Sequence, residues 1–549
     1  MLCNTIIMVL TGCALKNLAT EGVLCNAITM ALTSFTHDIQ FFPYITRYKT
    51  LSNMEEIFIL EMPLHVEQWQ ADLLNKRYEY LRKLYNYVQS KLLKQYEYFI
   101  QMNEYKECTG SCKTPLFEFF KTHSFHFRGI NNSQGLPLPI TFSKMGICAY
   151  VCQLAKKNIG DNTTYKDVGI NTCVLKHMGE HIWAAWDKMI FNKKTNRISF
   201  KKYGEMNILG AIKSGGYTCG FDIDLENFIL TFNLNGKQGK NGKYIHLPIL
   251  PNVKHADYET EALKGGYNSI RVLTIVRKLI RGKYKYYLQI TIKGKKPQKN
   301  RTLGKGNVGI DIGPSTIAIS CDSKVDVSQL ADKCENIQHK IAVINRKLDR
   351  SRRATNPDNF NENGTYKPIN RKNGERRTWY YSNRYKKLKA IRQELQRKQA
   401  AIRKLQHTEY VNTLLPLGNT FIVEKNPYCG WAKRSEGIRY DKNGKICSNK
   451  RYGHSIGIHA PSTLITLLEN KVKSLGGKMF KVDIRNAATG YDFTNGEYTK
   501  HDISDRKITL SNGDVHHRDI MAAFNLKHLN YDSKELKDYN IPEMYQDYD

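Results

Sequence analysis

An acidic residue stands in the middle of a short apolar segment, NVGIDIGPSTIAIS, at residues 307–320. The segment predicts two strands joined by a turn at Gly313 and Pro314, with Asp311 inside the first strand. A carboxylate in a buried strand costs free energy unless a partner compensates its charge. Asp311 is therefore either a hydrogen-bonded structural residue or a residue with a chemical role, and this segment alone leaves both interpretations open.

Two further acids follow in similar settings. Glu424 ends the apolar strand predicted for NTFIVEKNP, and NGDVHHRDIMAAFNLKHL predicts a helix that opens after Asn512 and Gly513, with Asp519 on a face of small residues. Acids from two strands and one helix can together hold two divalent metal ions, one activating water and the other stabilising the leaving oxygen of a phosphodiester. Mg²⁺ suits such an all-oxygen site, with Mn²⁺ as its substitute.

The charge of the chain points to a polyanionic partner. Eighty-four Lys and Arg against 51 Asp and Glu leave a formal net charge of +33, which repels itself unless nucleic acid or another polyanion is bound. A membrane surface is the alternative, but no clear apolar run or amphipathic segment supports it, and we expect no membrane contact. Thirteen irregularly spaced cysteines predict reduced thiols in the bacterial cytoplasm or nucleoid.

The texture of the sequence changes along its 549 residues and indicates several domains. Residues 1–54 differ in composition from the rest, and we expect an extension outside the folded body, with Met54 as an alternative start. Residues 55–66 predict a strand, residues 67–195 predict helices, and residues 196–300 predict mainly strands.

Two amphipathic patterns within residues 55–300 predict which way particular side chains face. The first long helix has an apolar stripe that includes Trp69 and a basic face that includes Arg77, which is either solvated or a track for phosphates. A β-hairpin that turns at Arg281 and Gly282 is expected to point Arg277 away from the core.

A basic and aromatic insertion, residues 328–410, lies between the first two acids. Cations can hold phosphates while aromatic rings stack on bases, and the alternative is a solvated basic helix with tyrosines packed inward. The residues that we expect to contact nucleic acid are Arg350, Arg352, Arg353, Arg376, Arg377, Trp379, Tyr380, Arg384, Lys386 and Lys387.

Taken together, GIDIG, the strand ending in VEK, and RD before a small-residue helix resemble the three RuvC motifs of TnpB proteins and type V CRISPR effectors, which are RNA-guided and, for TnpB, transposon-associated. The segment KLDRSRRATNPDNFNENGTYK resembles the insertion of that family. The resemblance covers residues 55–549. It implies a multidomain α+β fold, in which a helical recognition domain and a wedge-like β-barrel precede an RNase H-like (RuvC) α/β domain at residues 301–549.

The resemblance also implies an activity and partners. Asp311, Glu424 and Asp519 would be the metal-binding catalytic acids of a DNA endonuclease, with Arg518 beside the scissile phosphate. A guide RNA would select double-stranded DNA and its unwound strands by base pairing. The zinc-ribbon-like region at residues 485–513 departs from the family because it contains no cysteine, so we expect no zinc there.

Two alternatives have other signatures. A nuclease-inactive, RNA-guided DNA-binding repressor would be expected to lose an acid, and a transposase-type RNase H-like enzyme without guide RNA typically carries Glu where this chain has Asp519. The sequence leaves open the identity of the guide, the flanking motif, the cut pattern, the transposon or CRISPR context, and the oligomeric state.

Overall fold

The structure, a computed structural model of the chain, divides into two units at Glu56 and Ile57. The expected extension at residues 1–54 lies outside the described residues. The described residues are 56–108, 113–123, 125–131, 137–157, 164–192, 195, 197–212, 220–234, 242–297, 301–369, 376–434, 437, 439–440, 446–447, 452–483, 488–499, 501, 505–530 and 539–548.

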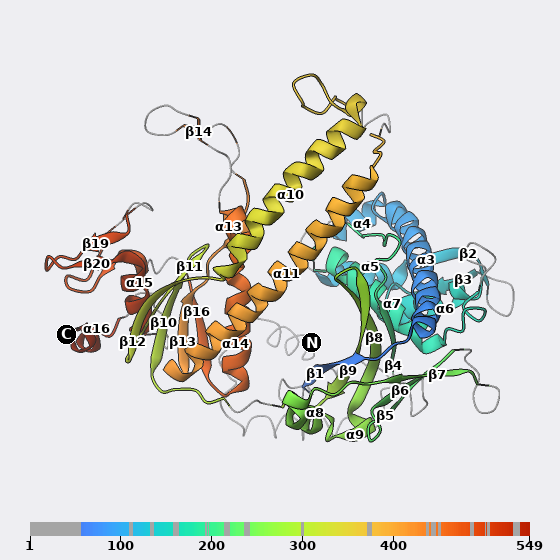
Figure 1. The fold of residues 1–549 in the computed structure, drawn as a ribbon, viewed down its shortest axis with the longest axis horizontal. Helices are drawn as coiled ribbons and strands as arrows, with labels where there is room; N and C mark the ends of the chain where they lie inside the picture. The colour runs from blue at the N-terminus through green and yellow to red at the C-terminus, as the bar shows by residue number, and fades with distance from the viewer. Residues whose placement is uncertain are drawn as a thin grey trace, which may run out of the picture. The chain divides into compact units, whose positions relative to one another are not determined.

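A five-stranded sheet organises the C-terminal half, in the order β12-β11-β10-β13-β16 (Figure 1). The first three strands along the chain pair antiparallel, and β13 and β16 run parallel to β10. The predicted strand–turn–strand at Asp311 is confirmed. The strands are β10 Asn307–Ile312, β11 Thr316–Cys321, β12 Lys324–Gln329, β13 Thr420–Glu424 and β16 Lys478–Val482.

The two faces of this sheet are covered by different helices. On one face Ile310 and Val423 are buried against α11 (Asn383–Leu414) and α14 (Pro461–Ser474). On the other face Gly309 lies directly under α15 (Arg518–Lys527), because a Cβ there would overlap the backbone of Ala523 and Lys527. Side chains alternate along a strand, so Asp311 shares the face of Gly309.

The insertion between β12 and β13 is a helical hairpin of α10 (Lys333–Thr355) and α11. Its tip is held by aromatic rings: the centroids of Phe360 and Tyr366 are 5.1 Å apart, and those of Phe360 and Trp379 are 5.9 Å apart. These rings make the tip a small folded cluster of its own.

The helices of the N-terminal half surround a separate apolar core. Ile182, Trp186 and Ile190 of α7 are all buried in it, and Trp186 Nε1 donates to Gln89 Oε1 at 2.7 Å. The helices are α3 Gln68–Phe99, α4 Asn103–Cys108, α5 Lys113–Thr122, α6 Lys144–Ala155, α7 Thr172–Ile190, α8 Ala256–Leu263 and α9 Gly266–Ser269.

The strands of this half form a four-stranded sheet, β1-β9-β8-β4, and a three-stranded sheet, β5-β6-β7, besides the pair β2-β3. The predicted hairpin is confirmed, with Arg281 and Gly282 at positive φ in its turn. The strands are β1 Ile57–Leu64, β2 Phe125–Asn131, β3 Pro137–Ile140, β4 Ile208–Ile212, β5 Phe221–Asp224, β6 Ile229–Asn233, β7 Tyr244–Pro248, β8 Ile270–Ile280 and β9 Lys283–Lys293.

Within the described residues these strands make no closed barrel, which corrects the wedge-like β-barrel that we expected. Leu64 and Ile249 form an isolated bridge that joins the two sheets at one corner, and β4 and β5 are edge strands. Helix α7 packs against β4 instead of a further strand. The sheets therefore stay open among the residues described.

Three side chains face the opposite way from the prediction. Trp69 is 53% exposed, whereas Arg77 is buried and donates to the carbonyl oxygens of Leu73 and Leu234, both at 2.8 Å. Arg277 is also buried, with its guanidinium 4.4 Å from the ring centroid of Tyr78. Carbonyls and rings from distant parts of the chain stabilise these charges, which a local pattern does not reveal.

The cysteine-free region, residues 485–513, contains short strands and an apolar cluster. Tyr491 stacks on Tyr539 with centroids 4.0 Å apart, and Asp492 accepts hydrogen bonds from the backbone N–H groups of Thr494 and Ser511. Apolar packing and hydrogen bonds thus stabilise this region. Its strands are β17 Tyr491–Asp492, β18 Glu497–Tyr498 and β19 Lys507–Thr509, and β19 pairs with β20 Val515–His517, which follows the region.

The remaining elements are α12 Tyr428–Trp431, β14 Arg439–Tyr440, β15 Ile446–Cys447, α13 Gly453–His459 and α16 Ile541–Tyr548. None of the helices in the described part of the chain combines the length and the apolarity needed to cross a membrane.

Candidate active site

The sheet brings the first two acids together. Ile310 of β10 pairs with Val423 of β13 in parallel register, so Asp311 and Glu424 are the next residues on adjacent strands. Glu424 is buried, like the rest of β13. Both acids lie on the face of the sheet that α15 covers.

Helix α15 brings the third acid to the same place. Asn307 at the start of β10 donates from Nδ2 to the carbonyl oxygen of Lys527 at 3.4 Å, so the end of α15 lies over the beginning of the strand. Asp519, Ala523 and Lys527 are four residues apart and share one face of the helix. Since the backbone at Ala523 lies over Gly309, Asp519 lies toward the Asp311 end of β10.

The helix itself begins later than predicted. Asn512 and Gly513 form the turn between β19 and β20 instead of opening the helix, because Val515–His517 pairs as a strand. His517 is the N-cap, and its Nδ1 accepts from the backbone N–H of Asp519 at 3.3 Å. Asp519 is therefore in the first turn, where the helix dipole favours a negative charge.

Burial raises the pKa of two of the acids, Asp311 and Glu424, and repulsion adds to the rise at Asp311. Removal from water, followed by the charges of Glu424 and Asp519, raises the pKa of Asp311 to about 8, against a lowering effect of Arg518. Burial raises the pKa of Glu424 to about 7, although the backbone N–H of Ala488 donates to it. The carboxylates are therefore close enough to interact and lack enough positive charge nearby.

Arginines hold the third acid. Arg518 donates from Nε and Nη2 to Oδ1 of Asp519 at 3.2 and 3.1 Å, and Arg506 lies 3.4 Å from Oδ2. Both carboxylate oxygens of Asp519 are thus engaged. The sequence analysis missed Arg506, because it belongs to an irregular segment and shows no motif.

Two other residues that the sequence analysis missed fix the strand end beside Asp311. Asn426 Nδ2 and Tyr428 Oη both donate to the carbonyl oxygen of Ile312 at 3.0 Å. Both follow Glu424 in the segment NTFIVEKNP and the start of α12, so the turn after β13 locks β10 to β13. The polar residues directly after the strand were the available signal.

Asn525 of α15 positions the segment that approaches Glu424. Its buried Nδ2 donates to the carbonyl oxygens of Ala488 and Tyr491, both at 2.8 Å. The N–H of Ala488 is the group that donates to Glu424. Helix α15 therefore contributes both an acid and the anchor of a neighbouring donor.

Some features of these acids suit a divalent cation and others do not. The donors are all carboxylate oxygens, as Mg²⁺ prefers, and the raised pKa values of Asp311 and Glu424 indicate a deficit of positive charge around these two. Over the residues that the structure describes, no group of three His, Cys, Asp or Glu is arranged to hold a metal. Asp519 would have to exchange an arginine for a metal ion.

The predicted nucleic-acid contacts fall into two groups. Arg352 and Arg353 pair with Asp349 at 2.5 and 2.7 Å, and Arg352 lies 5.3 Å from the ring centroid of Trp379. Arg377 lies 5.1 Å from the ring of Tyr366. These residues hold the tip together. The others are exposed, namely Arg350, Arg376, Tyr380, Arg384, Lys386 and Lys387.

No family model and no curated protein sequence matches the chain. Among solved structures, a cryo-EM structure of the Cas12f1–sgRNA–target DNA complex is similar with a TM-score of 0.48 and 14% identity, over 85% of this chain and 84% of that chain. A structure of the mini-RNA-guided endonuclease CRISPR-Cas_phi3 is similar with a TM-score of 0.31 and 11% identity, over 89% of this chain and 92% of that chain.

Proposed function

We propose that the chain is an RNA-guided DNA endonuclease that hydrolyses phosphodiester bonds at Asp311, Glu424 and Asp519, in the bacterial cytoplasm or nucleoid. The observation that carries the proposal is the meeting of these three acids on one face of the sheet, where burial raises the pKa of Asp311 and Glu424 and the charges of Glu424 and Asp519 raise that of Asp311 further. Clustered carboxylates with perturbed pKa values are typical of functional sites.

The strand order supports an RNase H-like fold for this half. Three antiparallel strands followed by two strands parallel to the first are the arrangement expected of a RuvC-like domain. Asp311 and Glu424 come from the two central strands and Asp519 from the covering helix, in the places that the sequence resemblance assigns to them.

The acids would hold two Mg²⁺ ions, or Mn²⁺ in their place, and these ions would supply an activated water and a stabilised leaving oxygen. Asp311 and Glu424 carry the charge that such ions require once they release their protons. Arg518, which now donates to Asp519, would turn to the scissile phosphate when a metal ion takes its place, since guanidinium binds carboxylate and phosphate alike.

The guide RNA is supported by the basic hairpin. The first turn of α11 contains no acid and carries Arg384 and Lys386, with Lys387 directly after it, although the helix dipole disfavours cations at an N-terminus. A phosphate backbone would offset this unfavourable placement. We propose that this end of the hairpin contacts the RNA or its duplex with the target strand.

The test is to purify the chain from its own locus, sequence the RNA that copurifies, and measure cutting of matched DNA with and without Mg²⁺. Asp311→Asn keeps the shape of a protonated aspartate and should reduce cutting by about a thousandfold without loss of RNA. Asp257→Asn, an exposed aspartate of α8, is the matched control and should cut normally.

Each departure has a meaning of its own. RNA and DNA binding by the wild type without cutting would favour a nuclease-inactive repressor. Cutting that survives in Asp311→Asn would remove the carboxylates from the mechanism. Cutting without any copurifying RNA would favour an enzyme of the transposase type.

A further inference from the structure

A second site lies in the N-terminal half, in a pocket of about 520 Å³ between α3, α7 and the segment that leads to β4. One face of α7 lines it, including His177, His181 and Lys188, and Tyr85 of α3 lies opposite. Pockets of this size accept small organic molecules or single residues of a polymer.

The pocket has a mixed lining. Leu81, Val174 and Met178 provide an apolar wall, and Met206 adds a thioether. Tyr85 borders the pocket with 8% of its surface exposed, and the ammonium of Lys201 lies 6.0 Å from the centroid of its ring. An aromatic ring next to apolar side chains suits a flat heterocycle.

The charge at the pocket is positive. Lys188, Arg197 and Lys201 line it against a single carboxylate, Glu205. The carboxylate is already used, because Glu205 accepts from the backbone N–H of Lys202 at 2.9 Å. Among the described residues, the ammonium groups of Lys188 and Lys201 form no ion pair, and they leave a net attraction for an anion.

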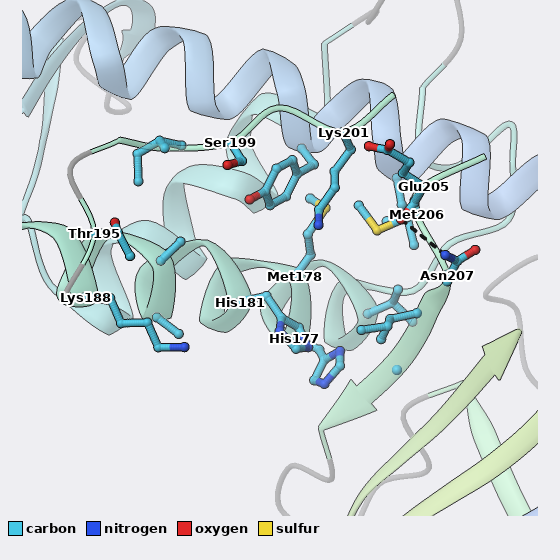
Figure 2. Close-up of a pocket in the computed structure, with 18 of the residues that line it drawn as sticks. His177, Met178, His181, Lys188, Thr195, Ser199, Lys201, Glu205, Met206 and Asn207 are labelled. Carbon is cyan, nitrogen blue, oxygen red and sulfur yellow. Dashed lines mark hydrogen bonds between the residues drawn. The ribbon is translucent and has the colours of Figure 1, made fainter. Parts of the chain in front are cut away.

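Lys201 is fixed in place by its backbone. Its N–H donates to Asn86 Oδ1 and its carbonyl accepts from Asn86 Nδ2, both at 2.8 Å, while Arg82 donates to the same carbonyl at 3.2 Å. Figure 2 shows its side chain extending toward α7. A lysine held this way presents its ammonium without further ordering of the backbone.

Two histidines provide uncharged polar groups. The rings of His177 and His181 are 4.6 Å apart and perpendicular, and His177 rests against Gly210 of β4, where a Cβ would overlap its ring. Burial, followed by the charge of His181, lowers the pKa of His177 to about 3, so its imidazole stays neutral at pH 7. A neutral ring both donates and accepts, as base edges require.

We propose that this pocket binds one unpaired nucleotide of a single-stranded RNA, with the base against Tyr85 and the apolar wall and the phosphate at Lys188, Arg197 and Lys201. The choice of RNA rests on the proposed function, because guide RNA is the stable polyanionic partner there. The chemistry that the pocket recognises is a flat heterocycle joined to a phosphate. The site is separate from the carboxylates and requires no cleavage.

The test is photo-crosslinking of the full chain to single-stranded RNA that contains 4-thiouridine, with mass spectrometry of the crosslinked peptides. We expect crosslinks within α7 and at Tyr85. Ala184→Trp, at an exposed position of α7 that lines the pocket, should reduce these crosslinks by about tenfold while crosslinks to peptides outside the pocket persist. Lys201→Gln should reduce them less, and Lys176→Gln, exposed on α7 outside the pocket lining, should not.

Three outcomes would overturn the proposal: RNA that crosslinks elsewhere but not in the pocket, pocket crosslinks that Ala184→Trp leaves unchanged, or crosslinks obtained only with 4-thiothymidine DNA. Millimolar adenosine monophosphate that removes the crosslink while RNA stays bound would support the pocket chemistry. Because no readout depends on DNA cutting, failure here is distinguishable from failure of the endonuclease proposal.

Discussion

Burial acts in opposite directions on two groups of titratable side chains, the carboxylates around Asp311 and the histidines of α7. It raises the pKa of Asp311 to about 8 and lowers the pKa of His177 to about 3. Near pH 7 Asp311 and His177 are therefore largely uncharged. The comparison teaches that one cause prepares two kinds of site: acids that gain a charge when a cation binds, and imidazoles that stay neutral toward the uncharged heterocycle of a ligand.

The largest expected difference is in the pH dependence of stability. The pKa of Asp311 is about 8 in the folded chain and 3.8 without the fold, so between these values the native state keeps a proton that the unfolded chain has lost. Stability then falls as pH rises through this window. In EDTA, Asp311→Asn should stabilise the protein by about 2 to 3 kcal/mol more at pH 8 than at pH 5, measured by urea unfolding. An equal effect at both pH values would contradict the raised pKa.

The next prediction compares two glycines, Gly309 beside the acids and Gly210 beside the histidines. Gly309 faces the backbone of α15, which cannot turn aside, whereas Gly210 faces the side chain of His177, which can. Gly309→Ala should cost about 2 kcal/mol and Gly210→Ala about 1 kcal/mol in thermal or urea unfolding. The Gly309 variant should also lose DNA cutting, because α15 carries Asp519. Equal costs would mean that α15 is not packed as closely on β10 as the structure has it.

Titration of His177 should change stability with pH in the opposite direction and by a smaller amount. The pKa of His177 is about 3 when folded and 6.5 otherwise, so protonation favours the unfolded chain and stability falls as pH drops below 6.5. Relative to the wild type, His177→Gln should raise the free energy of unfolding by about 1 kcal/mol at pH 5 and change it little at pH 8. Urea unfolding at both pH values measures it, and a variant that is destabilised more at pH 5 would reverse the interpretation.

The smallest effect concerns Arg506. Its side chain is 65% exposed, so its pair with Asp519 contributes little to stability. Because this arginine competes for an oxygen that a metal ion would need, Arg506→Gln should lower the Mg²⁺ concentration for half-maximal cutting by about twofold. Lys433→Gln, an exposed cation outside the site, should leave it unchanged. A higher Mg²⁺ requirement in Arg506→Gln would show that the arginine assists the metal.

Much of the candidate site follows from sequence because strands with isolated acids are local patterns. Asp311 and Glu424 each sit in a run of apolar residues, and the structure places both on adjacent strands. The start of α15 was predicted too early because Val515–His517 alternates weakly and its pairing with β19 is not visible in either segment alone. Asn426 and Tyr428 act through side-chain hydrogen bonds to the carbonyl oxygen of Ile312, and Arg506 acts through its ion pair with Asp519, so none of the three belongs to a motif.

The N-terminal half shows what a local pattern cannot supply. In the sequence Arg77 belongs to a basic helix face. In the structure it donates hydrogen bonds to the carbonyl oxygens of Gly169 and Leu234, which lie far along the chain. Arg277 is buried in the same way, with its guanidinium over the ring of Tyr78 and its Nε donating to Asn207 Oδ1. Alternating apolar and polar residues also predict strands, but they do not predict whether the sheet closes into a barrel. Closure depends on which edge strands pair with each other.

The hairpin of α10 and α11 has a mechanical consequence. Helix α11 has 32 residues and is therefore ~48 Å long. Val411 and Leu414 anchor one end in the core of the sheet, and the aromatic tip beyond the other end is held by its own contacts. A tilt of about 5° at the buried end displaces the tip by about 4 Å, which is comparable with the roughly 3.4 Å rise of one base pair. A rearrangement beside the acids that tilted the hairpin by this angle would therefore shift its basic tip by about one nucleotide step.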